Sequence, residues 1–121
     1  MRSVKGKFRL KKFEPLEKDI QNAVCEYLSL RHHFFYRQNN TPIFQKDGKG
    51  GGFFRAMPKY AMKGVPDIIV ITEGGFAVYL EIKRPSGRLS PEQELFKKMC
   101  AEKGCEYYRI TSVDQLQEIG L

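Results

Sequence analysis

The chain has 121 residues, the length of one domain, and its 21 basic and 14 acidic residues give a formal net charge of +7. It contains no apolar run long enough to cross a membrane and no secretory signal peptide, so we expect a soluble, cytoplasmic protein without a membrane partner. Its three cysteines lack the spacing of a zinc site. They therefore predict free thiols in a reducing compartment.

The positive charge is concentrated at the start of the chain. Residues 1–12 hold six basic residues and no acidic one, so the remainder is close to neutral. We interpret residues 1–12 as a flexible basic arm and residues 13–121 as a single domain. Such an arm can lie along nucleic-acid phosphates and add salt-dependent affinity. A solvated tail without a specific role fits the same charge pattern, and both interpretations stay open.

The first half of the chain predicts one helix and one clear strand. Pro15 and neighbouring acidic residues favour a helix start, and apolar residues at helical spacing extend the helix over residues 16–31. The aromatic stretch 34–39 predicts a strand. The glycine-rich segment 46–52 predicts a loop without regular structure, and residues 53–57 fit either a short strand or more loop.

The second half predicts a hairpin followed by a helix. Strands at 68–72 and 76–83 are separated by Glu-Gly-Gly, a common hairpin turn. Ser90 precedes a proline and has a glutamine three residues later. This pattern predicts a capped helix that runs to Lys103 and stops at the next glycine.

The chain ends with a predicted strand and a short helix. Residues 106–110 have strand composition, and Ser112 is expected to cap a helix that ends near residue 119. The predicted order is αβ(β)ββαβα, where the bracketed strand is the uncertain one. This order indicates an α/β fold with a mixed sheet and helices packed on it.

Charged residues interrupt the two apolar strands of the predicted hairpin. Asp67 opens the first strand, and Glu81 and Lys83 lie two residues apart near the end of the second. Residues two apart on a strand leave the same face, so Leu80 and Ile82 are expected to point into the core instead. Taken singly, such residues are usually a turn acid and solvated edge charges. Together they predict a polar site at the strand ends.

Two neighbouring carboxylates repel each other unless a cation lies between them. Few hard oxygen ligands with room for water suit Mg²⁺ or Mn²⁺. An ion of this kind binds a phosphate oxygen and lowers the pKa of a bound water, and Lys83 could orient that water or offset transition-state charge. The pattern therefore favours a phosphodiester hydrolase whose polymer partner is a nucleic acid.

The motifs GVPD and LEIKR resemble those of the PD-(D/E)xK nuclease superfamily, with Asp67, Glu81 and Lys83 in the three motif positions. The continuation EIKRPSGRLSPEQ resembles more narrowly the virus-type replication-repair nuclease (VRR-NUC) domain. In that family a loop and a helix with an early glutamine, here Gln93, follow the ExK strand. The resemblance covers roughly residues 14–119.

This resemblance implies a restriction-endonuclease-like mixed sheet flanked by helices and a Mg²⁺- or Mn²⁺-dependent, structure-specific DNA endonuclease. It also implies three metal ligands: the carboxylates of Asp67 and Glu81 and the backbone carbonyl of Ile82. Glu17 would support the metal, in part through water, although a glutamate favourable to the helix dipole fits there as well. Lys83 would position the nucleophile. Gln93 would contact the site, or only close the capping box.

The resemblance also bears on partners. It implies a phage or prophage product that acts as a homodimer on branched DNA such as four-way junctions. A monomeric flap or nicking nuclease and a non-catalytic nucleic-acid-binding module are the alternatives. Residues 44–60 are interpreted as a flap near the site, or as a disordered insertion. The basic residues expected to contact phosphates are Arg37, Lys46, Lys49, Arg55, Lys63, Arg84 and Arg88.

Overall fold

The structure, a computed structural model, describes residues 13–38, 44–54 and 58–121, so the predicted basic arm lies outside it. Its helices are α1 (Glu17–Leu30), α2 (Pro91–Lys103) and α3 (Asp114–Glu118). Its strands are β1 (Phe34–Arg37), β2 (Phe44–Lys46), β3 (Gly52–Phe54), β4 (Ile68–Ile71), β5 (Ala77–Ile82) and β6 (Glu106–Ile110). None of the helices in these ranges is both long and apolar enough to span a bilayer.

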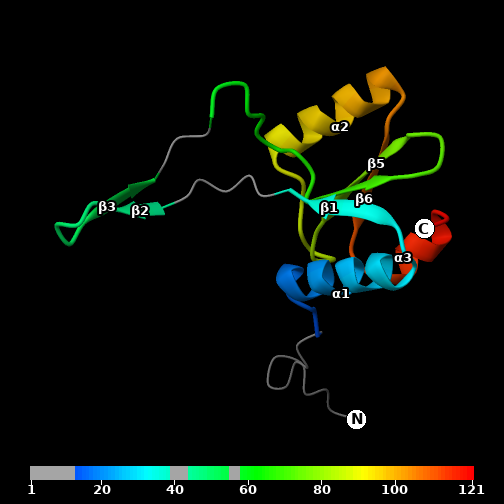
Figure 1. Ribbon diagram of the computed structural model, residues 1–121. Helices are drawn as coiled ribbons and strands as arrows, with labels where there is room; N and C mark the ends of the chain where they lie inside the picture. Colours follow the sequence, from blue (N-terminus) through cyan, green and yellow to red (C-terminus); the bar gives the residue numbers. More distant parts are fainter. Residues whose placement is uncertain (1–12, 39–43, 55–57) are drawn as a thin grey trace, which may run out of the picture.

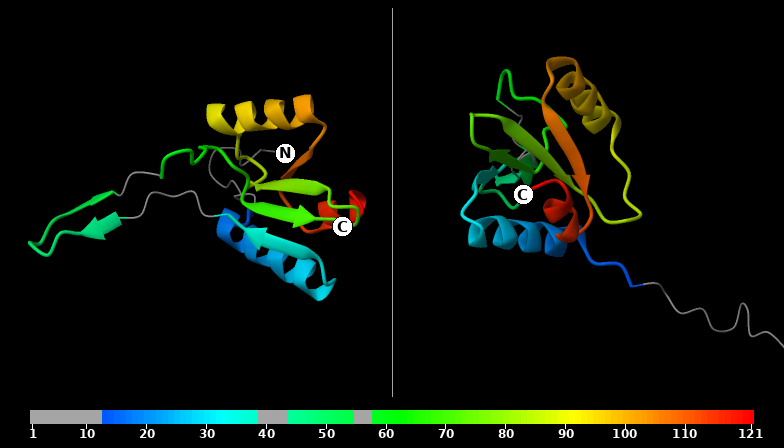
Figure 2. Two further views of the ribbon diagram at one scale, coloured as in Figure 1. Left: turned by 45° about the horizontal axis from the view of Figure 1, so that its top comes forward. Right: turned by 90° about the vertical axis from the view of Figure 1, so that its right-hand side faces the viewer.

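A four-stranded sheet in the order β1-β4-β5-β6 forms the centre of the fold. β1, β4 and β5 pair antiparallel, and β6 joins β5 in parallel, so the sheet is mixed. Helices α1 and α3 cover one face and α2 the other (Figures 1 and 2). This arrangement confirms the predicted α/β, restriction-endonuclease-like fold. The separate hairpin β2–β3 projects away from the sheet in both views.

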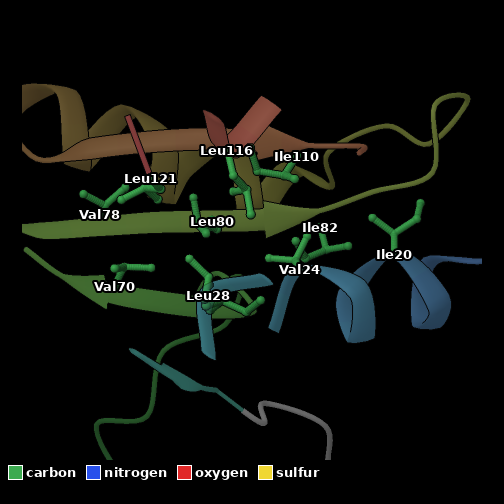
Figure 3. Close-up of a cluster of buried hydrophobic side chains, with 11 residues drawn as sticks. Ile20, Val24, Leu28, Val70, Val78, Leu80, Ile82, Ile110, Leu116 and Leu121 are labelled. Carbon is green, nitrogen blue, oxygen red and sulfur yellow. The ribbon is translucent and has the colours of Figure 1, made fainter. Parts of the chain in front are cut away.

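Alternating side chains of β5 decide which face carries the core and which carries the charged residues. Val78, Leu80 and Ile82 are buried against α1 and α3 in one apolar cluster (Figure 3). Tyr79 and Glu81 leave the opposite face, which α2 covers. Burying apolar side chains contributes about 25 cal/mol per Å². The cluster therefore holds β5 in one register and with it the position of the intervening glutamate.

Helix α2 begins and ends as its sequence predicts. The Gln93 N–H donates to Ser90 Oγ at 3.2 Å, and the Ser90 N–H donates to Gln93 Oε1 at 2.8 Å, which closes a capping box. Gly104 ends the helix with a φ of 77°, a left-handed conformation that glycine adopts without a Cβ clash. The strand predicted at residues 106–110 is confirmed at both of its ends.

The loop predicted over residues 46–52 is confirmed for residues 47–51, which belong to no helix or strand. The prediction is wrong at its two ends, Lys46 and Gly52, which belong to β2 and β3 and pair as a short antiparallel hairpin. Asp47 Oδ1 accepts hydrogen bonds from the Lys49 and Gly51 N–H groups at 2.8 and 3.2 Å. An aspartate that binds the backbone of its own turn stabilises the reversal that the glycines permit. The observed order thus has a small hairpin where one uncertain strand was predicted.

The prediction that Ser112 caps the last helix is also wrong. The N-cap residue is Val113, and its side chain makes no capping hydrogen bond. Instead, Gln115 Oε1 accepts hydrogen bonds from the Thr111 and Ser112 N–H groups at 2.6 and 3.3 Å. A side chain of the helix itself therefore satisfies the backbone groups that precede it.

Candidate active site

The start of β4 and the end of β5 lie side by side because the two strands are antiparallel, with Ile68 opposite Leu80. This register places Asp67, which precedes β4, beside Glu81. The Ile82 N–H donates to Asp67 Oδ2 at 2.8 Å, and this bond fixes the aspartate at the end of the sheet. The N-terminal ends of α1 and α2 lie at the same end (Figures 1 and 2). Helix N-termini carry partial positive charge, which favours anions there.

Glu81 is the only charged residue that is fully buried within the described ranges, with 1% of its surface exposed. Burial raises its pKa to about 9 from 4.5, helped by a carboxyl hydrogen bond to Asp67 and by the charge of that aspartate. The charge of Lys83 opposes this rise in pKa, and the charge of Glu17 adds to it. The structure therefore brings the four acidic and basic residues predicted for the site into one electrostatic environment.

One oxygen of this glutamate, Glu81 Oε1, is buried and has no hydrogen-bond partner. Leaving a buried polar atom without a partner costs about 1–3 kcal/mol, and more for a charged group. Two hard carboxylates beside the Ile82 backbone fit a small divalent cation that keeps several of its waters. No group of three His, Cys, Asp or Glu side chains in the described ranges could hold a metal. Because Glu17 is exposed, it fits a water-mediated contact better than direct ligation.

Lys83 continues β5 beyond the glutamate and is half-buried. Its N–H donates to the Ile110 carbonyl at 3.0 Å, so the backbone at the lysine is still held by β6. A lysine anchored one residue beyond a regular strand has little freedom of backbone position. Its ammonium group can therefore stay close to the carboxylate pair.

The GVPD segment packs against the first turn of α2. Gly64 has a φ of +78°, and a Cβ there would lie 2.5 and 2.6 Å from the carbonyl carbon and oxygen of Glu92 and 2.8 Å from the Gln93 nitrogen. Only glycine fits this approach, which sequence reasoning missed although the residue belongs to the motif. Gln93 therefore lies against the segment that leads to Asp67, while its own side-chain oxygen serves the capping box.

Two further residues that sequence reasoning missed hold the loop after β5. The Arg109 guanidinium donates from Nη2 to three carbonyls of that loop: Arg84 at 3.1 Å, Pro85 at 3.1 Å and Gly87 at 2.7 Å. Glu14 lies 3.3 Å from the Arg84 guanidinium and accepts from Ser86 Oγ at 2.9 Å. Arg84, predicted to contact DNA, is thus paired with an acid of the same chain.

The other predicted phosphate contacts are spread over the molecule. Arg37 is exposed at the end of β1, and Lys63 and Arg88 are exposed in the loops next to the site. The β2–β3 hairpin carries Lys46 and Lys49, away from the sheet. Arg55 lies outside the described residues. Lys63 and Arg88 thus lie in the segments that lead to Asp67 and away from Lys83 along the chain.

A mixed sheet with two carboxylates and a lysine at the ends of adjacent strands defines a nuclease-type α/β domain. The family model of the VRR-NUC domain matches residues 37–114, which include the three motif residues and Gln93 and leave out Glu17. The chain belongs to the VRR-NUC family, a family of nucleases, and the predicted resemblance is confirmed. Comparison with curated proteins and with solved structures finds no match.

Proposed function

We propose that the protein is a metal-dependent, structure-specific DNA endonuclease that hydrolyses phosphodiester bonds with Mg²⁺ or Mn²⁺. The single observation that carries this proposal is the carboxylate pair formed by half-buried Asp67 and fully buried Glu81. One of its oxygens has no partner, and Lys83 is its cationic neighbour. A purely structural role does not explain a buried acid whose burial disfavours the ionised form. A bound cation would favour that form.

The residues of the pair have different roles in this proposal. Asp67 is held by the Ile82 N–H and presents its carboxylate toward the site. Glu81 approaches from the α2 face, and the Ile82 carbonyl supplies a third oxygen. When bound, the divalent ion would offset phosphate charge and lower the pKa of the attacking water. Glu17, at the first turn of α1, supports the same centre through water.

Lys83 positions the nucleophile and offsets the negative charge that develops on the phosphorus centre. Its half-buried stem and fixed backbone restrict the ammonium to the region of the carboxylates. Gln93 closes the capping box at the N-terminal turn of α2, the turn against which Gly64 of the GVPD segment packs, and so supports the site. Its role is to contact and support the site rather than to take part in bond cleavage.

DNA would approach the end of the sheet at which both helices begin, since their N-termini and the nearby cations favour phosphates. Lys63 and Arg88 flank the site, and Arg37 extends the cationic surface along β1. Lys46 and Lys49 of the hairpin, together with Arg55, would contact more distant phosphates. Arg84 would reach a phosphate only by exchanging its Glu14 partner. The basic segment 1–12 would add salt-dependent affinity.

One site cuts one strand, so paired incisions require two copies of the chain. We propose a homodimer that acts on branched DNA such as a four-way junction, on the basis of the family resemblance and the two-fold symmetry of such substrates. A monomeric flap or nicking nuclease has the same site but makes unpaired cuts. Solution mass and mapping of the cut positions distinguish the two forms.

The proposal is tested with plasmid, duplex, flap, single-stranded and four-way-junction DNA in Mg²⁺ or Mn²⁺. Wild type and the Lys98→Ala control, which changes an exposed lysine of α2, are expected to cut. Lys83→Ala should cut at least about 100-fold more slowly, as expected for loss of a positioned catalytic group. If wild type and Lys83→Ala shift DNA equally in a gel and leave it intact, the protein is a binding module and the proposal is wrong.

A further inference from the structure

A second buried polar atom without a hydrogen-bond partner, the Tyr107 hydroxyl, belongs to the strand next to the Glu81 carboxylate. β5 and β6 run parallel, with Tyr79 opposite Tyr107 and Glu81 opposite Arg109. The tyrosine and the glutamate therefore leave the same face of the sheet, one diagonal step apart. Native proteins rarely leave two buried polar groups unpaired on neighbouring strands.

The tyrosine ring is held in place by aromatic contacts with α2. Phe96 packs edge-on against Tyr79 with ring centroids 5.2 Å apart, and its centroid lies 6.3 Å from that of Tyr107. The ring of Phe96 thus contacts both tyrosines and holds the helix against the sheet. Aromatic pairs of this kind contribute about 0.5–1.5 kcal/mol beyond their buried area, so the direction of the Tyr107 hydroxyl is set by packing.

The surroundings of the two tyrosine hydroxyls differ. Burial, and after it the charge of Glu81, raises the pKa of Tyr107. Burial also raises the pKa of Tyr79, but the charges that act on it are those of Cys105, Cys100 and Tyr36. Only the Tyr107 hydroxyl therefore lies in the electrostatic environment of the carboxylate pair, which makes Tyr79 a matched reference on the adjacent strand.

We propose that the Tyr107 hydroxyl is linked by hydrogen bonds through one water to Glu81 Oε1 and thereby orients this carboxylate toward a divalent cation. The inference rests on the proposed nuclease function. Tyr107 acts through Glu81 and is a positioning residue, because it touches neither metal nor DNA. A hydrogen bond from outside the ligand shell fixes the orientation of a ligating carboxylate, and its loss costs about 10- to 100-fold in metal affinity.

The test compares Tyr107→Phe with Tyr79→Phe, since each change removes a single hydroxyl from a tyrosine that packs against Phe96. Mn²⁺ binding to the full chain is measured by calorimetry and by the rise in melting temperature, both without DNA. Tyr107→Phe is expected to weaken Mn²⁺ binding at least about tenfold, whereas Tyr79→Phe leaves it unchanged. Cleavage by Tyr107→Phe should recover at high Mn²⁺, because only the occupancy of the site is reduced.

Equal Mn²⁺ affinities of wild type and Tyr107→Phe would overturn the inference and leave the nuclease proposal standing. Equal losses in Tyr107→Phe and Tyr79→Phe would also overturn it, since packing would then explain both. A wild type that binds no Mn²⁺ and cuts no DNA would instead refute the proposed function itself.

Discussion

Replacing the buried acid by its neutral isostere, Glu81→Gln, should stabilise the metal-free protein while it abolishes cleavage. The folded protein holds the Glu81 proton up to a pKa of about 9, whereas the unfolded chain releases it near 4.5. Between these pH values the folded state binds more protons, so the stability of wild type falls as pH rises. Glutamine has no proton to lose, and the variant should not show this fall.

The size of the effect follows from linkage. One proton released on unfolding lowers the free energy of unfolding by up to about 1.4 kcal/mol for each pH unit. We expect a gain of about 3 kcal/mol for Glu81→Gln at pH 8 and almost none at pH 5. In a domain of this size such a gain raises the melting temperature by about 10 °C.

The assay is urea and thermal denaturation of wild type and variant from pH 5 to pH 9 with a chelator present. Glu102→Gln, at an exposed position of α2, is the control for removing a carboxylate at the surface and should show no pH-dependent gain. Added Mn²⁺ should stabilise wild type and leave Glu81→Gln unaffected, since a ligand stabilises only the state that binds it. A variant that is equal to or less stable than wild type at pH 8 would refute the reasoning.

Two further predictions concern the supports of the site. Gly64→Ala should lower the free energy of unfolding, measured in urea, by about 2–5 kcal/mol, because the added Cβ meets the α2 backbone. The control Gly75→Ala, at a similar φ but with open space around it, should lose only about 1 kcal/mol. Equal losses in the two variants would contradict the packing argument. Arg109→Leu should speed amide hydrogen exchange in the loop 84–87 and slow cleavage, because the loop loses the guanidinium that holds its carbonyls. The melting temperature should stay within about 3 °C of wild type. Wild-type protection of that loop in the variant would contradict the role given to the guanidinium.

Much of the fold could be predicted because its signals are local. The capping box at Ser90 and the strand at 106–110 depend on residues within a few positions of each other. The alternation around Glu81 placed this acid on the face opposite the core, as the structure has it. Its burial under α2 could not be predicted, because alternation does not tell which layer covers the second face.

The errors arise where a polar side chain binds backbone that composition alone does not reveal. Asp47 organises the turn that the glycine count suggested was irregular, and Gln115 takes the capping role expected of Ser112. The ion pair between Glu14 and Arg84 joins residues 70 positions apart, so only the tertiary structure brings them together. For this reason the sequence alone overstated the availability of Arg84 to DNA.

The turn between β4 and β5, residues 73–75, lies at the end of the sheet opposite the acidic residues (Figure 1). It is solvent-exposed, and the strands on either side remain paired by their own ladder. A fluorophore or short affinity tag inserted there would leave the substrate-facing end uncovered. The chain thus offers an attachment point for single-molecule or surface-immobilised cleavage measurements, in which every tethered copy presents the same end to DNA.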